Sequence, residues 1–157
     1  MFTDGVIDNV RISTPKIYED ERGLLAELYR KDNIEEDYIP AMTYMSVTHP
    51  GMKRGPHEHA TQTDTFIFLG SSGFRVYLWD NRKLSQTYQT KQLVLVAPYV
   101  LTTIVIPPGI VHAYQNIGLQ EGWVLNAPNK LYKGWNRNLP VDEIRHEQNP
   151  QTEFILW

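Results

Sequence analysis

The chain has 157 residues, 41% of them hydrophobic, and its 15 basic and 18 acidic side chains leave a net charge of −3. This size and composition fit one globular domain, residues 1–157, with a sizeable core. The near-neutral charge balance argues against nucleic acid and anionic membrane surfaces as partners, so we expect a small molecule or a second copy of the chain.

The absence of cysteine excludes a disulfide framework and a thiolate nucleophile. The first ten residues carry Asp4 and Asp8 and lack the basic-then-apolar pattern of a secretory signal, so we expect a cytoplasmic protein. Residues 92–120 contain no Asp, Glu, Lys or Arg, and this stretch is long enough for a membrane span. Pro98, Pro107 and Pro108 disfavour a helix there. We predict buried strands in that region instead.

Short strands separated by turns are predicted along the first half of the chain. A β-rich stretch at 6–12 precedes turns at 14–15 and 20–23, a strand at 24–29 and one helical turn at 32–38. Residues 41–48 then lead into a strand that carries His57 and His59. Strands at 65–69 and 74–80 are predicted to form a hairpin around Gly70–Gly73.

Further strands are predicted near 86–97, 100–106, 112–117 and 122–126, followed by a tail rich in Trp and Tyr. Many short strands with Gly and Pro turns, and hardly any helical periodicity, indicate a β-sandwich or barrel.

Three histidines are the strongest indication of chemistry. Side chains alternate along a strand, so His57 and His59 point to one face and Glu58 to the other. A Pro-Pro-Gly turn delivers His112 at the start of another apolar strand. We therefore expect three imidazoles to converge in one cavity, where a histidine can act as a base near neutral pH.

The histidine spacing resembles the two cupin motifs, with Asp64 where the first motif has Glu. The residues that carry this resemblance are Gly51, His57, His59, Asp64 and Gly70 in the first motif, and Pro107, Gly109, His112 and Asn116 in the second. Within the cupins the chain is most similar to dTDP-4-dehydrorhamnose 3,5-epimerases and related sugar-nucleotide epimerases and ketoisomerases. Four segments carry that similarity, namely Asp20–Gly23 with Glu27, Arg54–His57, Gln62, and Ile106–Gly109 with His112.

This resemblance implies an all-β fold, the cupin double-stranded β-helix (jelly-roll β-sandwich) with antiparallel sheets. It implies a homodimer in which N-terminal strands, about residues 5–48, augment the partner's sheet. The implied reaction is proton abstraction next to the carbonyl of a 4-keto sugar nucleotide, in surface polysaccharide (O-antigen or capsule) precursor synthesis, without a cofactor.

The resemblance also implies roles for individual residues. His57 would be the base, and Arg54 and His112 would line the sugar site. Beside His57 and His112 we count Asp64 as a catalytic candidate from its place in the first motif, where it would orient His57 or contact a sugar hydroxyl. The remaining substrate-binding candidates are Arg22 and Glu27, for the diphosphate, together with His59 and Gln62.

The chain departs from the epimerase pattern at three places. Asp64 stands where those enzymes carry a lysine that steadies the enolate, and their catalytic tyrosine aligns with Leu125. The carboxylate that pairs with their histidine is expected beyond the last residue of this chain. The first departure keeps two alternatives open, a metal-dependent cupin enzyme with His57, His59, Asp64 and His112 as ligands of a divalent ion, and a non-catalytic sugar-binding relative.

Two further features have a plainer alternative beside the functional one. Arg22 can bind phosphate or belong to a solvated turn. Tyr77 and Trp79 can stack on a ligand but are more typical of a core. Residues 130–137 are predicted to cover the cavity mouth.

Overall fold

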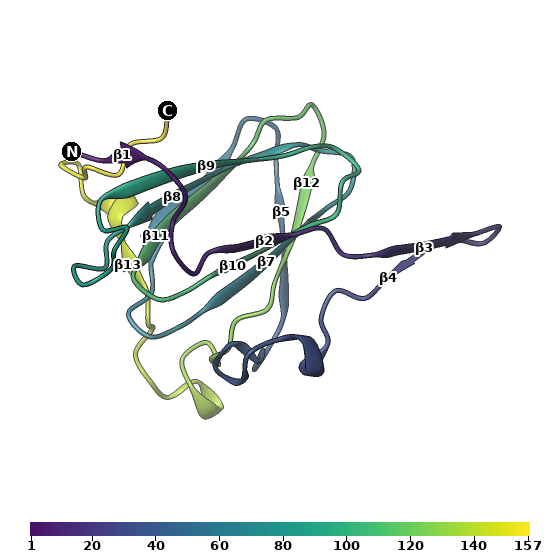
Figure 1. Cartoon of the computed structure of the whole chain (residues 1–157), viewed down its shortest axis with the longest axis horizontal. Coiled ribbons are helices and arrows are strands. Elements are labelled where there is room, and N and C mark those ends of the chain that lie inside the picture. The colour runs from purple at the N-terminus through teal and green to yellow at the C-terminus, as the bar shows by residue number, and fades with distance from the viewer.

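The computed structural model describes residues 1–157 as two β-sheets packed face to face, with a separate hairpin extending away from them (Figure 1). One sheet has six strands in the order β1-β9-β8-β11-β6-β13, and all neighbours are antiparallel except β1 and β9. Its strands are β1 Thr3–Asp4, β9 Thr90–Val96, β8 Phe74–Asp80, β11 Ile110–Asn116, β6 Lys53–Glu58 and β13 Ile144–Arg145.

The second sheet has five antiparallel strands in the order β2-β10-β7-β12-β5. Its strands are β2 Arg11–Ser13, β10 Thr102–Ile106, β7 Asp64–Leu69, β12 Gly122–Asn126 and β5 Tyr44–Thr48. The predicted jelly-roll sandwich with antiparallel sheets is therefore confirmed.

The core lies between the two sheets because each strand turns alternate apolar side chains inward. Phe68 from one sheet and Phe74 from the other are both fully buried, with ring centroids 5.0 Å apart. The rest of this cluster is Ile7, Phe66, Val76, Leu78, Val94, Val96, Ile104, Ile106, Ile110, Tyr114 and Val124.

The predicted hairpin of residues 65–69 and 74–80 is wrong. β7 pairs with β10 and β12, whereas β8 pairs with β9 and β11, so the Gly70–Gly73 turn carries the chain from one sheet to the other. The reason is the contact between Phe68 and Phe74, which pack across the core and therefore need opposite sheets.

A second apolar cluster lies on the outer face of the six-stranded sheet. Tyr77 and Trp79 are each 1% exposed and are covered by Phe154 and Trp157 of the C-terminal segment. Both aromatics therefore belong to a core and are not platforms for a ligand.

The remaining elements lie outside the two sheets. β3 (Ile17–Asp20) and β4 (Gly23–Ala26) form the hairpin that projects from the body in Figure 1. In place of the single helical turn predicted at 32–38, two 3-10 turns form, Lys31–Asn33 and Glu36–Tyr38, because Glu35 between them is extended. No helix in the chain has the length and apolar character needed to cross a membrane.

Candidate active site

The three histidines converge as the sequence predicts. His57 on β6 is the register partner of His112 on β11, and His59 follows directly after β6. The ring centroids lie 4.5 Å apart for His57 and His112, 5.8 Å for His57 and His59, and 5.9 Å for His59 and His112.

A glycine permits this close approach of β6 and β11. Gly55 has φ +82°, and a Cβ atom there would lie 2.5 Å from the carbonyl oxygen of His112. Any other residue would both strain the backbone and separate the two strands, so the histidine pairing depends on Gly55.

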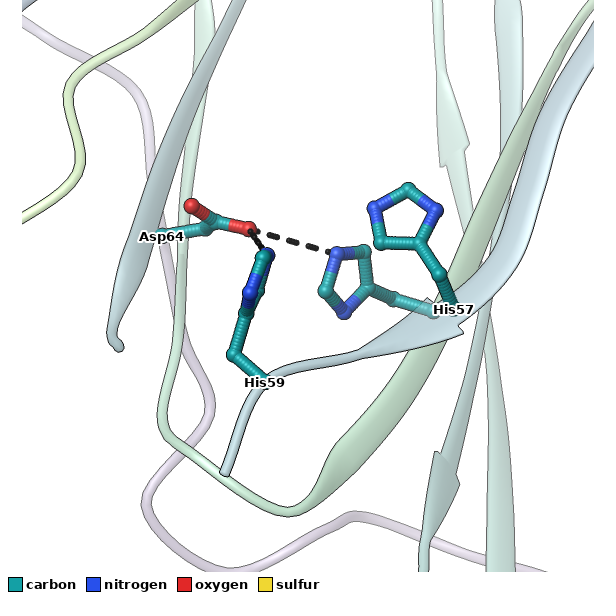
Figure 2. Close-up of side chains that lie close together, drawn as sticks. His57, His59 and Asp64 are labelled. Carbon is teal, nitrogen blue, oxygen red and sulfur yellow. Dashed lines mark ion pairs between the residues drawn. The ribbon is translucent and has the colours of Figure 1, made fainter. Parts of the chain in front are cut away.

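Asp64 approaches the histidines from the opposite sheet, at the start of β7. One carboxylate oxygen, Oδ2, lies 3.1 Å from His59 Nε2 and 3.3 Å from His112 Nε2. Figure 2 shows His59 and Asp64 joined in this way, with the His57 ring beside them. The other oxygen, Oδ1, accepts hydrogen bonds from Gln62 Nε2 at 2.9 Å and Asn126 Nδ2 at 3.0 Å.

The ring orientations leave atoms at the centre of this group unpartnered. His112 Nδ1 donates to the Ile110 carbonyl at 3.0 Å, and His59 Nδ1 donates to the Asp142 carbonyl. Both Nε2 atoms therefore face Asp64, yet Asp64 Oδ2 and His112 Nε2 are buried without a hydrogen-bond partner. Two nitrogens directed at one buried carboxylate oxygen require a proton or another cation between them.

Burial and charge separate the acid-base behaviour of these groups. Burial lowers the pKa of His57 to about 2, aided by His112 and His59, so its ring is neutral over the physiological range. Burial also opposes ionisation of His59 and Asp64. Contacts with Asp64 nevertheless raise the pKa of His59, and contacts with His112 and His59 hold the pKa of Asp64 below its usual range.

A cavity of about 1480 Å³ opens beside the histidines. One wall comes from residues 128–137 and 139–143, which agrees with the predicted cover at residues 130–137. Its basic lining residues are Lys53, Arg54, Lys130, Lys133, Arg137 and Arg145, and its aromatic ones are Tyr44, Phe66, Tyr114, Tyr132 and Trp135.

Two acidic residues late in the chain complete the site, and the sequence reasoning missed both. Glu143 Oε1 lies 3.9 Å from His57 Nε2, so the expectation that the carboxylate partner of His57 lies beyond this chain is wrong. The Asp142 carboxylate accepts hydrogen bonds from Ala60 N at 2.8 Å and Thr61 N at 2.9 Å. No local pattern marks these residues, since β13 brings them to β6 from more than 80 positions away.

The residue that follows β13 contacts the opposite face of the histidine strand. The carboxylate of Glu58, which points away from the cavity as predicted, accepts hydrogen bonds of 2.9 Å from His146 Nε2 and Asn81 Nδ2. The C-terminal segment therefore contacts both faces of β6.

The other predicted site residues divide into two groups. Arg54 and Gln62 line the cavity, together with His57 and His59. Arg22 and Glu27 do not, because both belong to the projecting hairpin region, where Arg22 pairs with Asp20 at 2.5 Å and Glu27 with Arg30 at 3.3 Å.

The position aligned with the epimerase tyrosine does not face the cavity. On β12 the inward side chains are those of Val124 and Asn126, each 1% exposed, whereas Leu125 lies on the outer side. Asn126 donates both to Asp64 and, at 2.8 Å, to the phenol oxygen of Tyr44 on the adjacent strand β5.

Comparison with known proteins gives a consistent result. The family model of dTDP-4-dehydrorhamnose 3,5-epimerase matches residues 4–133. The chain is 30% identical over 127 residues to the probable low-salt glycan biosynthesis epimerase Agl13 of Haloferax volcanii, covering 80% of this chain and 81% of the relative. It is 30% identical over 153 residues to the spore coat polysaccharide biosynthesis protein SpsL of Bacillus subtilis, covering 95% and 99%.

Among solved structures, the fold is similar to dTDP-6-deoxy-D-glucose-3,5-epimerase RmlC of Legionella pneumophila, determined in complex with dTDP-4-keto-L-rhamnose. The TM-score is 0.76 at 24% identity, over 98% of this chain and 82% of that one. At this level of identity the likeness concerns the fold.

Proposed function

The chain belongs to the dTDP-4-dehydrorhamnose 3,5-epimerase family, and from that membership we propose that it epimerises a 4-keto sugar nucleotide in polysaccharide precursor synthesis. The reaction removes a proton from a carbon next to the keto group and returns one to the opposite face. The two relatives are named for low-salt glycan biosynthesis and for spore coat polysaccharide biosynthesis, which supports this biological role.

The observation that carries the proposal is the environment of His57. The ring faces the cavity and has the Glu143 carboxylate 3.9 Å from Nε2. A neutral imidazole can accept the substrate proton, and the nearby carboxylate then stabilises the imidazolium that forms. Arg145 pairs with the other carboxylate oxygen of Glu143, Oε2, at 2.7 Å and so holds this side chain beside His57.

The enolate left behind needs positive charge or hydrogen-bond donors. Asp64 replaces the lysine of the family pattern, so another group in this chain must supply the positive charge that stabilises the enolate. We assign that role to His59, whose pKa is raised beside Asp64, and to Arg54 at the cavity wall.

The nucleotide diphosphate fits the basic wall of the cavity. Lys53, Arg54, Lys130, Lys133 and Arg137 all line it and supply donors for phosphate oxygens. A dTDP-linked 4-keto sugar should therefore raise the melting temperature through ligand linkage, and the unlinked sugar should do so much less. Equal shifts would contradict the diphosphate assignment.

His57→Asn tests the base directly. Asparagine keeps some hydrogen bonding but accepts no proton at neutral pH, so turnover should fall by roughly 10²- to 10⁴-fold. Substrate binding should change little, and deuterium uptake from heavy water should disappear. If the wild-type protein exchanges no substrate proton with solvent, the epimerase assignment is wrong.

A second candidate function, metal-dependent catalysis, is favoured by the donor geometry. One ligand atom from each of His57, His59, Asp64 and His112 lies within 4.8 Å of the others, and Asp64 Oδ2 and His112 Nε2 lack partners. Both His59 and His112 donate Nδ1 to backbone carbonyls, the usual support of a metal-bound imidazole. These residues fit a divalent transition metal, which would act as a Lewis acid on the keto oxygen.

Metal content separates the two candidates. Protein purified without added metal should contain about one ion per chain if the site is a metal centre, and Asp64→Asn and His59→Gln should both lose it. Asp64→Lys restores the family residue. A metal-free wild type in which Asp64→Lys and His59→Gln remain active would eliminate the metal-dependent candidate.

We also propose that the chain forms a homodimer through its N-terminal strands. Ile17, Leu24 and Leu25 on the projecting hairpin are 40%, 68% and 63% exposed, an apolar surface that a second copy would cover. Arg22 and Glu27 lie on or next to this hairpin and would act in a partner's site rather than their own. Light scattering should give a dimer at micromolar concentration, and Leu24→Glu should give a monomer.

A further inference from the structure

We propose that Tyr44 is the acid that returns the proton to the substrate, on the face opposite His57. This inference rests on the proposed epimerase function. Inversion at a carbon requires proton removal from one face and delivery to the other, so a site with a single base is incomplete. The cavity must therefore present a second acid-base group across from His57.

Tyr44 reaches the cavity from the opposite sheet. His57 is carried by β6 in the six-stranded sheet, and Tyr44 by β5 in the five-stranded sheet, and both line the same cavity. A sugar ring bound between the sheets would therefore have these side chains on its two sides.

The connection between β5 and β6 places the two residues at the same end of the cavity. Across the turn that joins these strands, Arg54 Nε donates to Thr48 Oγ1 at 3.3 Å. Tyr44 precedes Thr48 by four residues on β5, and His57 follows Arg54 by three residues on β6. Between these two positions, the hydroxyl oxygens of Ser46 on β5 and Tyr114 on β11 lie 2.9 Å apart. β5 therefore packs closely against the six-stranded sheet here.

Hydrogen bonding leaves the phenol proton of Tyr44 free. Asn126 Nδ2 donates to the Tyr44 oxygen at 2.8 Å and to Asp64 Oδ1 at 3.0 Å. The Asp64 carboxylate only accepts, which fixes the orientation of the Asn126 amide. The Tyr44 oxygen is therefore an acceptor towards Asn126, and its own O–H can point into the cavity.

The other cavity tyrosines are less suited to this role. Tyr114 is 4% exposed and its hydroxyl is engaged with Ser46, whereas Tyr44 is 47% exposed and accessible to a ligand. Tyr132 lies in the covering segment, and no hydrogen bond fixes its phenol. Tyr44 alone combines a fixed phenol oxygen with access to the cavity.

The proton and electron balance of the step is simple. The C–H bond breaks, its proton moves to His57, and the electron pair passes into the enolate. The enolate then takes the Tyr44 proton on the opposite face, forming the new C–H bond and a phenolate. Solvent returns a proton to Tyr44 and removes one from His57, so no further reactant is needed.

Tyr44→Phe in heavy water, with a dTDP-linked 4-keto-6-deoxyhexose, tests this assignment. We expect deuterium to enter the substrate with retained configuration, because His57 still removes and returns the proton on its own face. Formation of the epimer should fall at least about 10²-fold. Phenylalanine keeps the ring, and an unchanged melting temperature with a normal ligand-induced shift would verify that the variant is folded and binds.

The controls separate this proposal from its alternatives. His57→Asn should lose exchange and inversion together, and Tyr99→Phe, a surface change at a residue outside the cavity lining, should lose neither. Inversion at the wild-type rate in Tyr44→Phe, or its loss only in Tyr132→Phe, would overturn the assignment. Equal loss of exchange and inversion in Tyr44→Phe would also overturn it, since the residue would then position the substrate. Absence of both in the wild type would instead refute the proposed function.

Discussion

Replacing Asp64 by asparagine should destabilise the protein by about 3 kcal/mol near pH 6, the lower end of the range for breaking a buried charged pair. Asp64 is 1% exposed, and its carboxylate lies within 3.3 Å of His59 Nε2 and His112 Nε2. The asparagine amide carries no charge to stabilise these two imidazole rings. Its NH2 group would also face either the two rings or the donors that now bond to Asp64 Oδ1, which are Gln62 Nε2 and Asn126 Nδ2. For a domain of this size, about 3 kcal/mol corresponds to a fall of about 6–12 °C in Tm.

The sign of the pH dependence follows from the two pKa shifts. The pKa of Asp64 is lowered on folding, so its contribution is present above about pH 4, its unfolded value, and is lost as the pH falls towards the folded value. The pKa of His59 is raised, so its contribution is present below about pH 6.5 and is lost as the pH rises through the folded value. The difference between wild type and variant should therefore be largest between about pH 4 and 6.5.

Urea unfolding of chelator-treated protein at pH 5, 7 and 9 measures this difference without a contribution from bound metal. Asp80→Asn is a matched control, because Asp80 is also fully buried but pairs with Arg82 at 2.8 Å, in a group separate from the histidines. This control should be destabilised without losing sugar-nucleotide binding. A loss of stability in Asp64→Asn that is below about 1 kcal/mol at pH 5 would refute the charge pairing that we describe.

Three other predictions follow from backbone, charge and packing. Gly55→Ala should cost at least about 2 kcal/mol in urea unfolding and reduce activity, because the added Cβ would meet the His112 carbonyl at 2.5 Å from a backbone with positive φ; a neutral result would contradict the strand spacing. The lowered pKa of His57 means that only the unfolded chain takes up its proton below about pH 6.5, so stability should fall by up to about 1.4 kcal/mol per pH unit on acidification. His57→Asn should reduce that slope, and an unchanged slope would show that the ring is already charged in the folded protein. Phe68→Ala should cost about 3–5 kcal/mol in chemical denaturation, since the ring is fully buried between the sheets; a cost under about 1 kcal/mol would argue against the core assignment.

The histidine cluster was predictable because its information is local. Alternation along β6 places His57 and His59 on one face, and the Pro-Pro-Gly turn marks the start of the strand with His112. The jelly-roll sandwich followed from the same short, turn-separated strands and from the family resemblance.

The missing partners were not predictable because they come from distant segments. Glu143 reaches His57 through β13, a strand of only two residues with no pattern of its own. Tyr44 meets Asn126 across the β5–β12 ladder, a pairing that depends on the sheet order. Local turn signals likewise do not reveal which sheet a strand joins, and the error at the Gly70–Gly73 turn has that cause.

The docking of β13 on β6 has a consequence for synthesis on the ribosome. β6 is made early, yet its outer edge acquires a partner only after residues 144 and 145 have left the ribosome. Until then the nascent chain exposes the free N–H and C=O groups of its histidine strand, an edge that could pair with another chain. The Asp142 and Glu143 contacts form in the same event, so proton-transfer competence should appear only once this segment has emerged and docked. Nascent chains stalled before residue 142 should bind chaperones that recognise exposed strand edges, and released chains that contain β13 should not.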